Sequence, residues 1–395
     1  MMDFNELSEE LTGLTVFRSL LGDTVIAPLR QLIHAVADGL PIRVPYAEFT
    51  AALYKYTDNL TDYITTAVLE NENVYLLRRA RGQEISDAIR SCLEHELSVL
   101  EEVSQLTPEH FRRETGYKGF LPEWHTSSCV LKEIYAARAE QASTHGYGMF
   151  ARYDAFFLNN GTLVPVKNPD RTALSDLYGY EAQRQEVLEN TAALLNGKPA
   201  VNLLLYGDAG TGKSSTVKAV ANHFKDRGLR LIELKKSQLR EIPGLIDQLS
   251  ENPLRFILFI DDLSFTKDDD DFSALKAVLE GSVSSRSGNV VIYATSNRRH
   301  LVKENFSDRN GDDIHFNDTM QEMVSLSDRF GLTITFLRPN KSEYQSIVAE
   351  LARQYGVNMD ARVLAVKADA FAIRKSGYSP RVAKQFIELM KAAAD

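Results

Sequence analysis

The feature that most restricts the fold of this 395-residue chain is one run, Gly207-Asp-Ala-Gly-Thr-Gly-Lys-Ser214, which follows the apolar segment Val201–Tyr206 and precedes a helix-forming stretch. Its glycines let backbone N–H groups turn onto phosphate oxygens, and the N-terminus of the following helix adds partial positive charge. The run therefore predicts a phosphate-binding loop between a strand and a helix. An ordinary glycine-rich turn is the alternative, and a chance match has a probability on the order of one in a hundred.

The loop predicts ATP and Mg²⁺ as ligands. Lys213 is expected to offset the charge of the β- and γ-phosphates, and Ser214 to ligate Mg²⁺. The expected nucleotide-binding residues are Gly207, Asp208, Ala209, Gly210, Thr211, Gly212, Lys213, Ser214 and Ser215.

A second apolar segment, Phe256–Ile260, ends in the consecutive carboxylates Asp261 and Asp262. This is the form of a Walker B element, so Asp261 is expected to hold the magnesium ion and Asp262 to act as general base toward the attacking water. Many ATPases of this type carry glutamate at the second place, and the shorter reach of Asp262 leaves open whether hydrolysis is efficient, slow or lost. Alternatively, Asp262 merely starts the next loop.

Two further polar residues lie next to predicted strands, Asn297 after the run that starts at Val290 and Arg329 before the run Leu332–Phe336. Asn297, after the buried run that starts at Val290, is expected to orient the attacking water. Thr295, Ser296 or Asn297 could equally cap the next helix. Arg329 is expected to be an arginine finger that reaches the γ-phosphate of a neighbouring subunit, or else to satisfy the carbonyls of a helix end.

Arg381 lies in the first turn of a predicted helix, with Ser379 as N-cap and Pro380 at the first helical position. Its charge there opposes the helix dipole, which predicts an anionic ligand such as phosphate or a neighbouring carboxylate.

The acidic run Asp268–Asp271 precedes another helix-like stretch. Helix capping in a solvated loop is the favoured interpretation, and a second metal site is the alternative. Phe265 and Phe272 flank the run, and the sequence does not distinguish a pore-loop role from a place in the core.

The chain divides by pattern into an N-terminal helical domain (1–150), a linker rich in Gly, Asn and Pro (151–171), an α/β core (172–338) and a helical lid (339–395). In the first domain, apolar residues recur at helical spacing between Ile85 and Val103. In the core, short β-branched runs alternate with amphipathic segments, which predicts a three-layer fold around a parallel sheet: Val201–Tyr206, Leu229–Leu234, Phe256–Ile260, Val290–Ala294 and Leu332–Phe336.

The net charge and the lack of membrane-spanning or signal sequences indicate which partners and which location to expect. Forty-five basic and fifty-four acidic residues give a net charge of −9, which does not indicate nucleic acid as a partner. No apolar stretch approaches the ~20 residues needed to span a bilayer, and the first residues lack the features of a signal peptide. Two cysteines are too few for a disulfide framework. A cytoplasmic location is expected.

The order of these features, with Arg329 at the end of the core and Arg381 in a helical lid, resembles the AAA+ ATPases from about Thr172 onward. More closely, the chain resembles a bacterial family of stand-alone AAA+ ATPases known as a domain of unknown function, through the runs LLYGDAGTGKSSTVKA, FILFIDDLSF, LKAVLEG, VVIYATSNRRHLV and LSDRFGL. The resemblance implies strand order 5-1-4-3-2, nucleotide between core and lid, and assembly into a homo-oligomer. It also implies that the segment Leu177–Glu181 packs on adenine. Arg298 and Arg299 would line an interface, or form a solvated pair.

Three functions compete. The first is an ATPase that couples Mg-ATP hydrolysis to the remodelling or loading of an unknown protein client. The second is a nucleotide-gated binding module, similar to a helicase loader, with weak or no hydrolysis. The third is a P-loop kinase, which would need an acceptor pocket and no arginine from a neighbour; Arg329 and the lid disfavour it.

Overall fold

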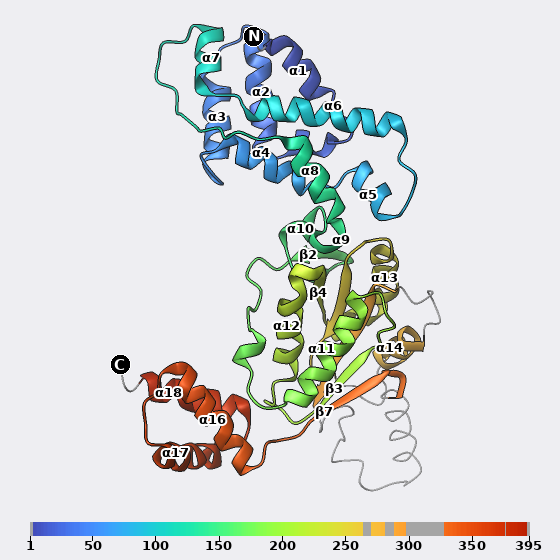
Figure 1. Cartoon of the computed structure of the whole chain (residues 1–395), viewed down its shortest axis with the longest axis vertical. Helices are drawn as coiled ribbons and strands as arrows, with labels where there is room; N and C mark the ends of the chain where they lie inside the picture. The colour runs from blue at the N-terminus through green and yellow to red at the C-terminus, as the bar shows by residue number, and fades with distance from the viewer. Residues whose placement is uncertain (1–2, 264–269, 281–287, 298–327, 376, 393–395) are drawn as a thin grey trace. The chain divides into compact units, whose positions relative to one another are not determined.

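The computed structural model describes residues 3–263, 270–280, 288–297, 328–375 and 377–392. The chain forms two compact units, Met1–Arg152 and Tyr153–Asp395 (Figure 1). Among the helices in these described ranges, none is both long enough and apolar enough to cross a membrane. Phe265, Asp268, Asp269, Arg298 and Arg299 lie outside the described residues, as do the side chains of Asp270, Asp271 and Phe272.

The N-terminal unit is helical, as predicted. It contains α1 (Phe4–Thr12), α2 (Ile26–Ala37), α3 (Arg43–Leu53), α4 (Leu60–Leu69), α5 (Val74–Ala80), α6 (Asp87–Ser104), α7 (Pro108–Thr115), α8 (Leu131–Glu140), α9 (Ala142–His145) and α10 (Met149–Arg152). Its core includes a cluster of rings in which Trp124 contacts Tyr46, Phe49 and Phe111. On α6, the predicted stripe is buried from Leu93 to Val103, whereas Cys92 is exposed.

A buried carboxylate joins α6 to the start of the chain. Glu96 is 4% exposed, and its carboxylate accepts hydrogen bonds from the backbone N–H groups of Thr15 (2.8 Å), Val16 (3.0 Å) and Phe17 (2.9 Å). These donors compensate the carboxylate for the loss of water. Glu96 therefore has a structural role in this unit.

Over its described residues, the second unit is built on a seven-stranded sheet of order β2-β1-β4-β5-β6-β3-β7. Its strands are β1 (Ala155–Asn159), β2 (Thr162–Pro165), β3 (Leu203–Gly207), β4 (Leu229–Leu234), β5 (Arg255–Ile260), β6 (Val290–Asn297) and β7 (Leu332–Phe336). All neighbours pair in parallel except β1 with β2. The predicted order of the five core strands is confirmed as β7-β3-β6-β5-β4.

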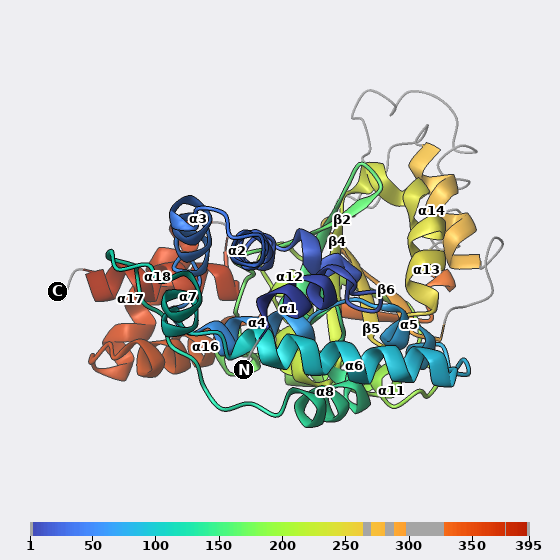
Figure 2. The same cartoon turned by 90° about the horizontal axis from the view of Figure 1, so that it is seen from above.

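Helices cover both faces of this sheet, which makes the predicted three layers (Figure 2). Helices α11 (Glu181–Leu195) and α12 (Lys213–Phe224) pack on one face, where Val187, Val217 and Phe224 join the strand residues in one core. Helices α13 (Ile242–Ser250) and α14 (Asp270–Glu280) lie on the other face.

The segment 151–171, predicted to be a linker, is different in the structure because it contributes two strands to the sheet. Asn160 (φ 49°) and Gly161 (φ 74°) form the turn of a hairpin in which Asn159 pairs with Thr162. Two consecutive positive φ angles are typical of the tight turn that Asn-Gly favours between antiparallel strands. Treating these residues only as helix and strand breakers overlooked that hairpin signal.

The lid contains α16 (Lys341–Tyr355), α17 (Ala361–Arg374) and α18 (Pro380–Ala392). They share a small core that includes Tyr344, Leu351 and Phe386. The predicted N-cap of the last helix is confirmed, since the Ser379 hydroxyl accepts a hydrogen bond from the N–H of Val382 at 3.3 Å.

Candidate functional site

The loop Gly207–Ser214 has the close backbone packing that its glycines allow. Gly207 has φ 144°, and a Cβ there would lie 2.1 Å from the carbonyl oxygen of Phe336 on β7. Gly210 has φ 79°, and a Cβ there would lie 3.3 Å from the Ser379 hydroxyl and from the Cβ of Arg381. Glycine alone adopts these angles without strain. The loop is therefore enclosed by β7 on one side and the lid on the other.

Lys213 opens α12 and is only 6% exposed. Its Nζ donates to the carbonyl oxygens of Gly207 (3.1 Å) and Asp208 (2.8 Å) and to Oδ1 of Asn297 (3.0 Å). Burial lowers the pKa of Lys213 below its usual 10.5, and the carboxylate of Asp208 opposes that effect.

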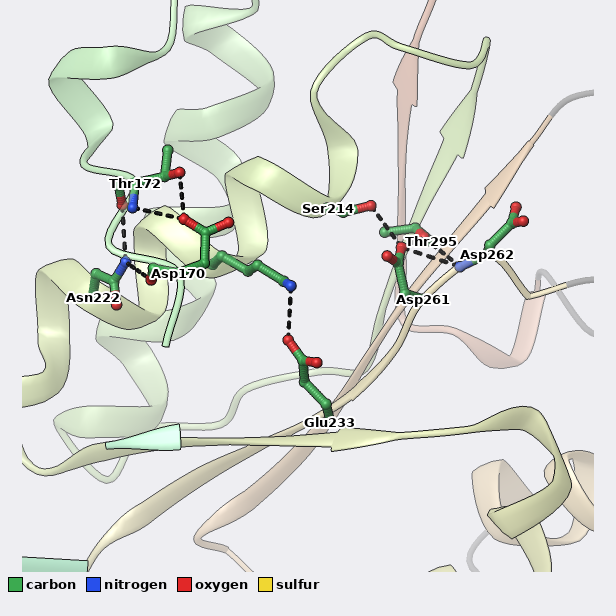
Figure 3. A network of polar contacts seen from close by, with 9 residues as sticks. Asp170, Thr172, Ser214, Asn222, Glu233, Asp261, Asp262 and Thr295 are labelled. Carbon is green, nitrogen blue, oxygen red and sulfur yellow. Dashed lines mark hydrogen bonds and ion pairs between the residues drawn. The ribbon is translucent and has the colours of Figure 1, made fainter. Parts of the chain in front are cut away.

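The carboxylate of Asp261 lies directly beside the first turn of α12. Its Oδ1 accepts hydrogen bonds from the hydroxyls of Ser214 and Thr295, each at 2.6 Å, and from the backbone N–H of Asp262 at 3.1 Å. Figure 3 shows Ser214, Thr295 and Asp261 converging while the Asp262 side chain points away from them. The predicted magnesium pair, Ser214 and Asp261, is thus brought together.

Asn297 connects the two halves of the site. Its Nδ2 donates to Oδ1 of Asp262 at 2.6 Å, while its Oδ1 accepts from Lys213. The strand register explains this placement, because Asn297 at the end of β6 pairs with Gly207 at the end of β3. A hydrogen-bonded row therefore runs from Lys213 through Asn297 to Asp262.

On the other side of the loop is a pocket of about 630 Å³ between the core and the lid. Gly210, Gly212 and Arg381 lie in its wall, and so do Tyr178 and Tyr180 from the segment that resembles an adenine-packing element. The backbone N–H of Arg381 donates to the carbonyl oxygen of Gly210 at 3.2 Å. The pocket has the position and the volume expected of a site for the base and ribose of a nucleotide.

A strap before α11, residues 166–180, leads into this pocket. Asn222 on α12 holds it by donating to the carbonyl oxygens of Asp170 (2.8 Å) and Thr172 (2.9 Å), as Figure 3 shows. The hydroxyl and the backbone N–H of Thr172 hydrogen-bond to Asp170 and lower the pKa of its carboxyl below the usual 3.8. Thr172 itself lines the pocket.

Arg329 lies apart from these residues. It precedes β7, whose first residue Leu332 pairs with Leu203, whereas Gly207 pairs with Phe336 at the other end of the strand. Arg329 is half-buried and lies near the amino end of β7, opposite the phosphate-binding loop.

The sequence did not predict two contacts at the site. Thr295 was considered only as a helix cap, yet its hydroxyl binds Asp261. The Asp208 carboxylate accepts a hydrogen bond from the N–H of Arg338 at 3.1 Å, in the connection from β7 to the lid. The change from the apolar run Val290–Ala294 to the polar residues Thr295 and Ser296 was a usable signal for Thr295. No comparable pattern marks Arg338.

The chain is similar to known proteins over parts of its length. The family model described as "Protein of unknown function (DUF815)" matches residues 150–394. The 26S proteasome regulatory subunit 4 homologue of Dictyostelium discoideum is 32% identical over 115 residues, and homologue B of Arabidopsis thaliana is 31% identical over 116. Each match covers 26% of this chain, which spans only 26% of either relative.

Among solved structures, the Thermotoga maritima RuvB Holliday junction branch migration motor is 17% identical, with a TM-score of 0.35. That match covers 55% of this chain and 63% of the other. The phosphate-binding loop, the confirmed strand order and a family match over more than half of the chain agree with one another. The chain is therefore an ATP-binding AAA+ protein and belongs to the family described as a protein of unknown function, DUF815.

Proposed function

We propose that this protein binds Mg-ATP and hydrolyses it as a subunit of a homo-oligomer, and that hydrolysis drives the remodelling or loading of a protein client. The hydrogen-bonded row from Lys213 through Asn297 to Asp262, beside the Ser214–Asp261 pair, is the observation that carries the proposal. In this proposal, a lysine that binds phosphate, a metal ligand and a general base lie together at the carboxyl ends of the adjacent strands β3, β6 and β5.

Phosphate binding is the first step. Backbone N–H groups of the loop and the Lys213 ammonium would bind the β- and γ-phosphates, at the N-terminus of α12. Lys213 would exchange its bonds to carbonyl oxygens and to Asn297 for phosphate oxygens. Ser214 and Asp261 would hold Mg²⁺, which when bound neutralises charge on the phosphates.

Water activation is the second step. Loss of Lys213 as a partner would leave the Asn297 amide to orient the attacking water, with Asp262 accepting its proton. The hydrogen bond of 2.6 Å between the Asn297 amide and the Asp262 carboxylate supports this division of roles.

Two arginines would stabilise the charge of the transition state from different directions. Arg381 lines the pocket beside Gly210 in the same chain. Arg329 lies near the opposite end of β7 from the loop. This separation supports a role of Arg329 at a neighbour's nucleotide rather than at its own. This arrangement supports a homo-oligomeric enzyme.

A nucleotide-gated binding module with weak hydrolysis is the second candidate. The observation in its favour is Asp262 itself, whose carboxylate is bound by Asn297 and whose side chain is one methylene shorter than the usual glutamate. Under this alternative, ATP would be bound normally and turned over slowly or not at all.

The first test is Lys213→Ala, measured by calorimetry for binding and by phosphate release for turnover. Loss of a charge-assisted contact worth about 1.5–3 kcal/mol should weaken ATP binding roughly 10- to 100-fold and abolish turnover. An unchanged affinity of Lys213→Ala for ATP would show that the loop Gly207–Ser214 does not bind the phosphates as proposed. Wild-type binding without turnover would favour the binding module.

Mixed subunits test the oligomeric part of the same proposal. Arg329→Ala should bind ATP normally but hydrolyse it about 10³- to 10⁵-fold more slowly. When it is mixed with Lys213→Ala, an intact loop from one subunit and an intact arginine from the other can meet at one interface, and part of the activity should return. No recovery would make Arg329 a local structural residue.

A further inference from the structure

Consecutive carboxylates at the end of a strand do not ordinarily serve one site, because successive side chains of a strand point to opposite faces. Asp261 and Asp262 directly follow β5, and Asp262 departs from the extended backbone with φ 52°. This left-handed conformation is uncommon for residues other than glycine, although Asp tolerates it better than most. Something in the surroundings must stabilise it.

Thr295 supplies that stabilisation. Ile260 pairs with Ala294, so the next residues along the two strands, Asp261 and Thr295, lie side by side. Thr295 is 2% exposed. Its hydroxyl donates to Oδ1 of Asp261 at 2.6 Å and accepts from the backbone N–H of Asp262 at 2.9 Å.

One hydroxyl carries one proton and two acceptor lone pairs, so both bonds can exist together. The donated bond keeps the Asp261 carboxylate on the side of Ser214. The accepted bond, drawn in Figure 3, fixes the backbone of Asp262 in the left-handed turn. This turn directs the second carboxylate to Asn297, whose Nδ2 donates to it. The buried side chain of Thr295 therefore holds the carboxylates of Asp261 and Asp262 on different sides of the site.

We infer that Thr295 is the positioning residue for both carboxylates, setting the affinity of the site for Mg²⁺ through Asp261 and the rate of hydrolysis through Asp262. The inference rests on the proposed Mg-ATP function. Thr295 touches neither nucleotide nor metal in this account and acts only through the two aspartates. Groups that orient a metal ligand in this way typically change metal affinity or activity 10- to 100-fold when removed.

Ser296 provides a matched control. It is the next residue on β6, it is fully buried, and its hydroxyl donates to the backbone carbonyl of Leu263 at 2.7 Å. Ser296→Ala therefore removes one buried hydrogen bond from the same strand, but none to a carboxylate, whereas loss of the Thr295 hydroxyl removes two. Any effect of general destabilisation should appear in both variants.

The experiment compares Thr295→Val, Thr295→Ser and Ser296→Ala in the full chain. A fluorescent ATP analogue reports binding in EDTA and across a Mg²⁺ titration, phosphate release reports kcat, and thermal unfolding reports stability. Thr295→Val keeps the shape of the side chain and lacks the hydroxyl. It should bind nucleotide in EDTA like wild type, need about 10- to 100-fold more Mg²⁺ for half-saturation, and lose kcat by a similar factor.

Thr295→Ser keeps the hydroxyl and should restore both quantities to near wild type, while Ser296→Ala should lower only the unfolding temperature. If Thr295→Val matches Ser296→Ala in Mg²⁺ requirement and kcat, Thr295 is merely structural and the inference is wrong. That outcome leaves the proposed function intact, provided that Lys213→Ala still binds ATP more weakly than wild type. If Lys213→Ala binds ATP normally, the proposed function itself fails.

Discussion

At the scale of single residues, Lys213 shows how a buried cation is kept available for a phosphate. Three oxygen acceptors compensate its ammonium for the loss of water, yet burial still lowers its pKa below 10.5. The charged form of Lys213 is therefore less stable here than in a free lysine. A polyphosphate that replaced the neutral acceptors would stabilise this charged form.

This pKa gives a pH dependence of binding with a definite sign. A phosphate binds the charged lysine, so as pH rises through the lowered pKa, below 10.5, binding must be accompanied by proton uptake. ATP affinity should fall by up to about tenfold per pH unit in that range. Calorimetry across alkaline pH measures it. Lys213→Arg should show a flatter profile, because guanidinium stays protonated.

Wild-type affinity that is constant up to pH 10.5 would mean that burial does not lower this pKa.

The sequence predicted most of the residues near the phosphate loop because their types and spacing follow from the chemistry of phosphate and Mg²⁺. Ser214 and Asp261 were predicted as a pair and lie within hydrogen-bonding distance. Contacts that depend on the register between distant strands were not predictable in this way. Thr295 beside Asp261 and Asp208 beside Arg338 are of that kind.

At the scale of elements, apolar runs predicted the five core strands well because buried parallel strands carry a continuous signal. The hairpin of β1 and β2 was missed because its strands are short and its signal lies in a two-residue turn. The helical unit contains a different kind of local signal, at the start of α7. There the Nδ1 of His110 accepts the backbone N–H of Thr107 at 3.0 Å, which completes a capping box.

This cap should respond to acid. Burial lowers the pKa of His110 below its usual 6.5, so the folded state binds the proton less well than the unfolded chain. Stability should be highest above pH 6.5 and fall as pH drops through the lowered pKa, since protonation removes the acceptor at Nδ1. Chemical unfolding of the chain at several pH values, followed through Trp124, measures it.

His110→Gln keeps an acceptor that suits this position of a capping box and does not titrate. The variant should lose the part of the acid sensitivity that comes from the cap. Equal acid sensitivity in both proteins would show that His110 does not contribute.

At the scale of the whole molecule, the second unit begins at Tyr153 rather than at the predicted start of the core, 172. Strand β1 pairs with β4 from Ala155 to Phe157, and the strap that follows β2 reaches the nucleotide pocket. We propose that residues 153–171 are an integral part of the nucleotide-binding unit.

Two truncations test this boundary. Residues 153–395 should bind ATP with the affinity of the full chain. Residues 172–395 leave β4 as an unpaired edge and remove the anchor of the strap, so they should unfold several degrees lower and tend to aggregate. Thermal unfolding, light scattering and ATP titration compare the two fragments. If the two fragments had equal stability and equal ATP affinity, residues 153–171 would be a linker and the proposal would be wrong.

The hydrogen bond from Arg381 to Gly210 has one more consequence. The first N–H groups of a helix have no acceptor within that helix. In α18, the N–H of Arg381 donates instead to the carbonyl oxygen of Gly210 in the phosphate-binding loop. The amide proton of Arg381 is consequently shielded only while lid and loop are in contact. The rate at which this proton exchanges with deuterated solvent should therefore report how often the lid moves away from the loop. The measurement needs no label on the nucleotide.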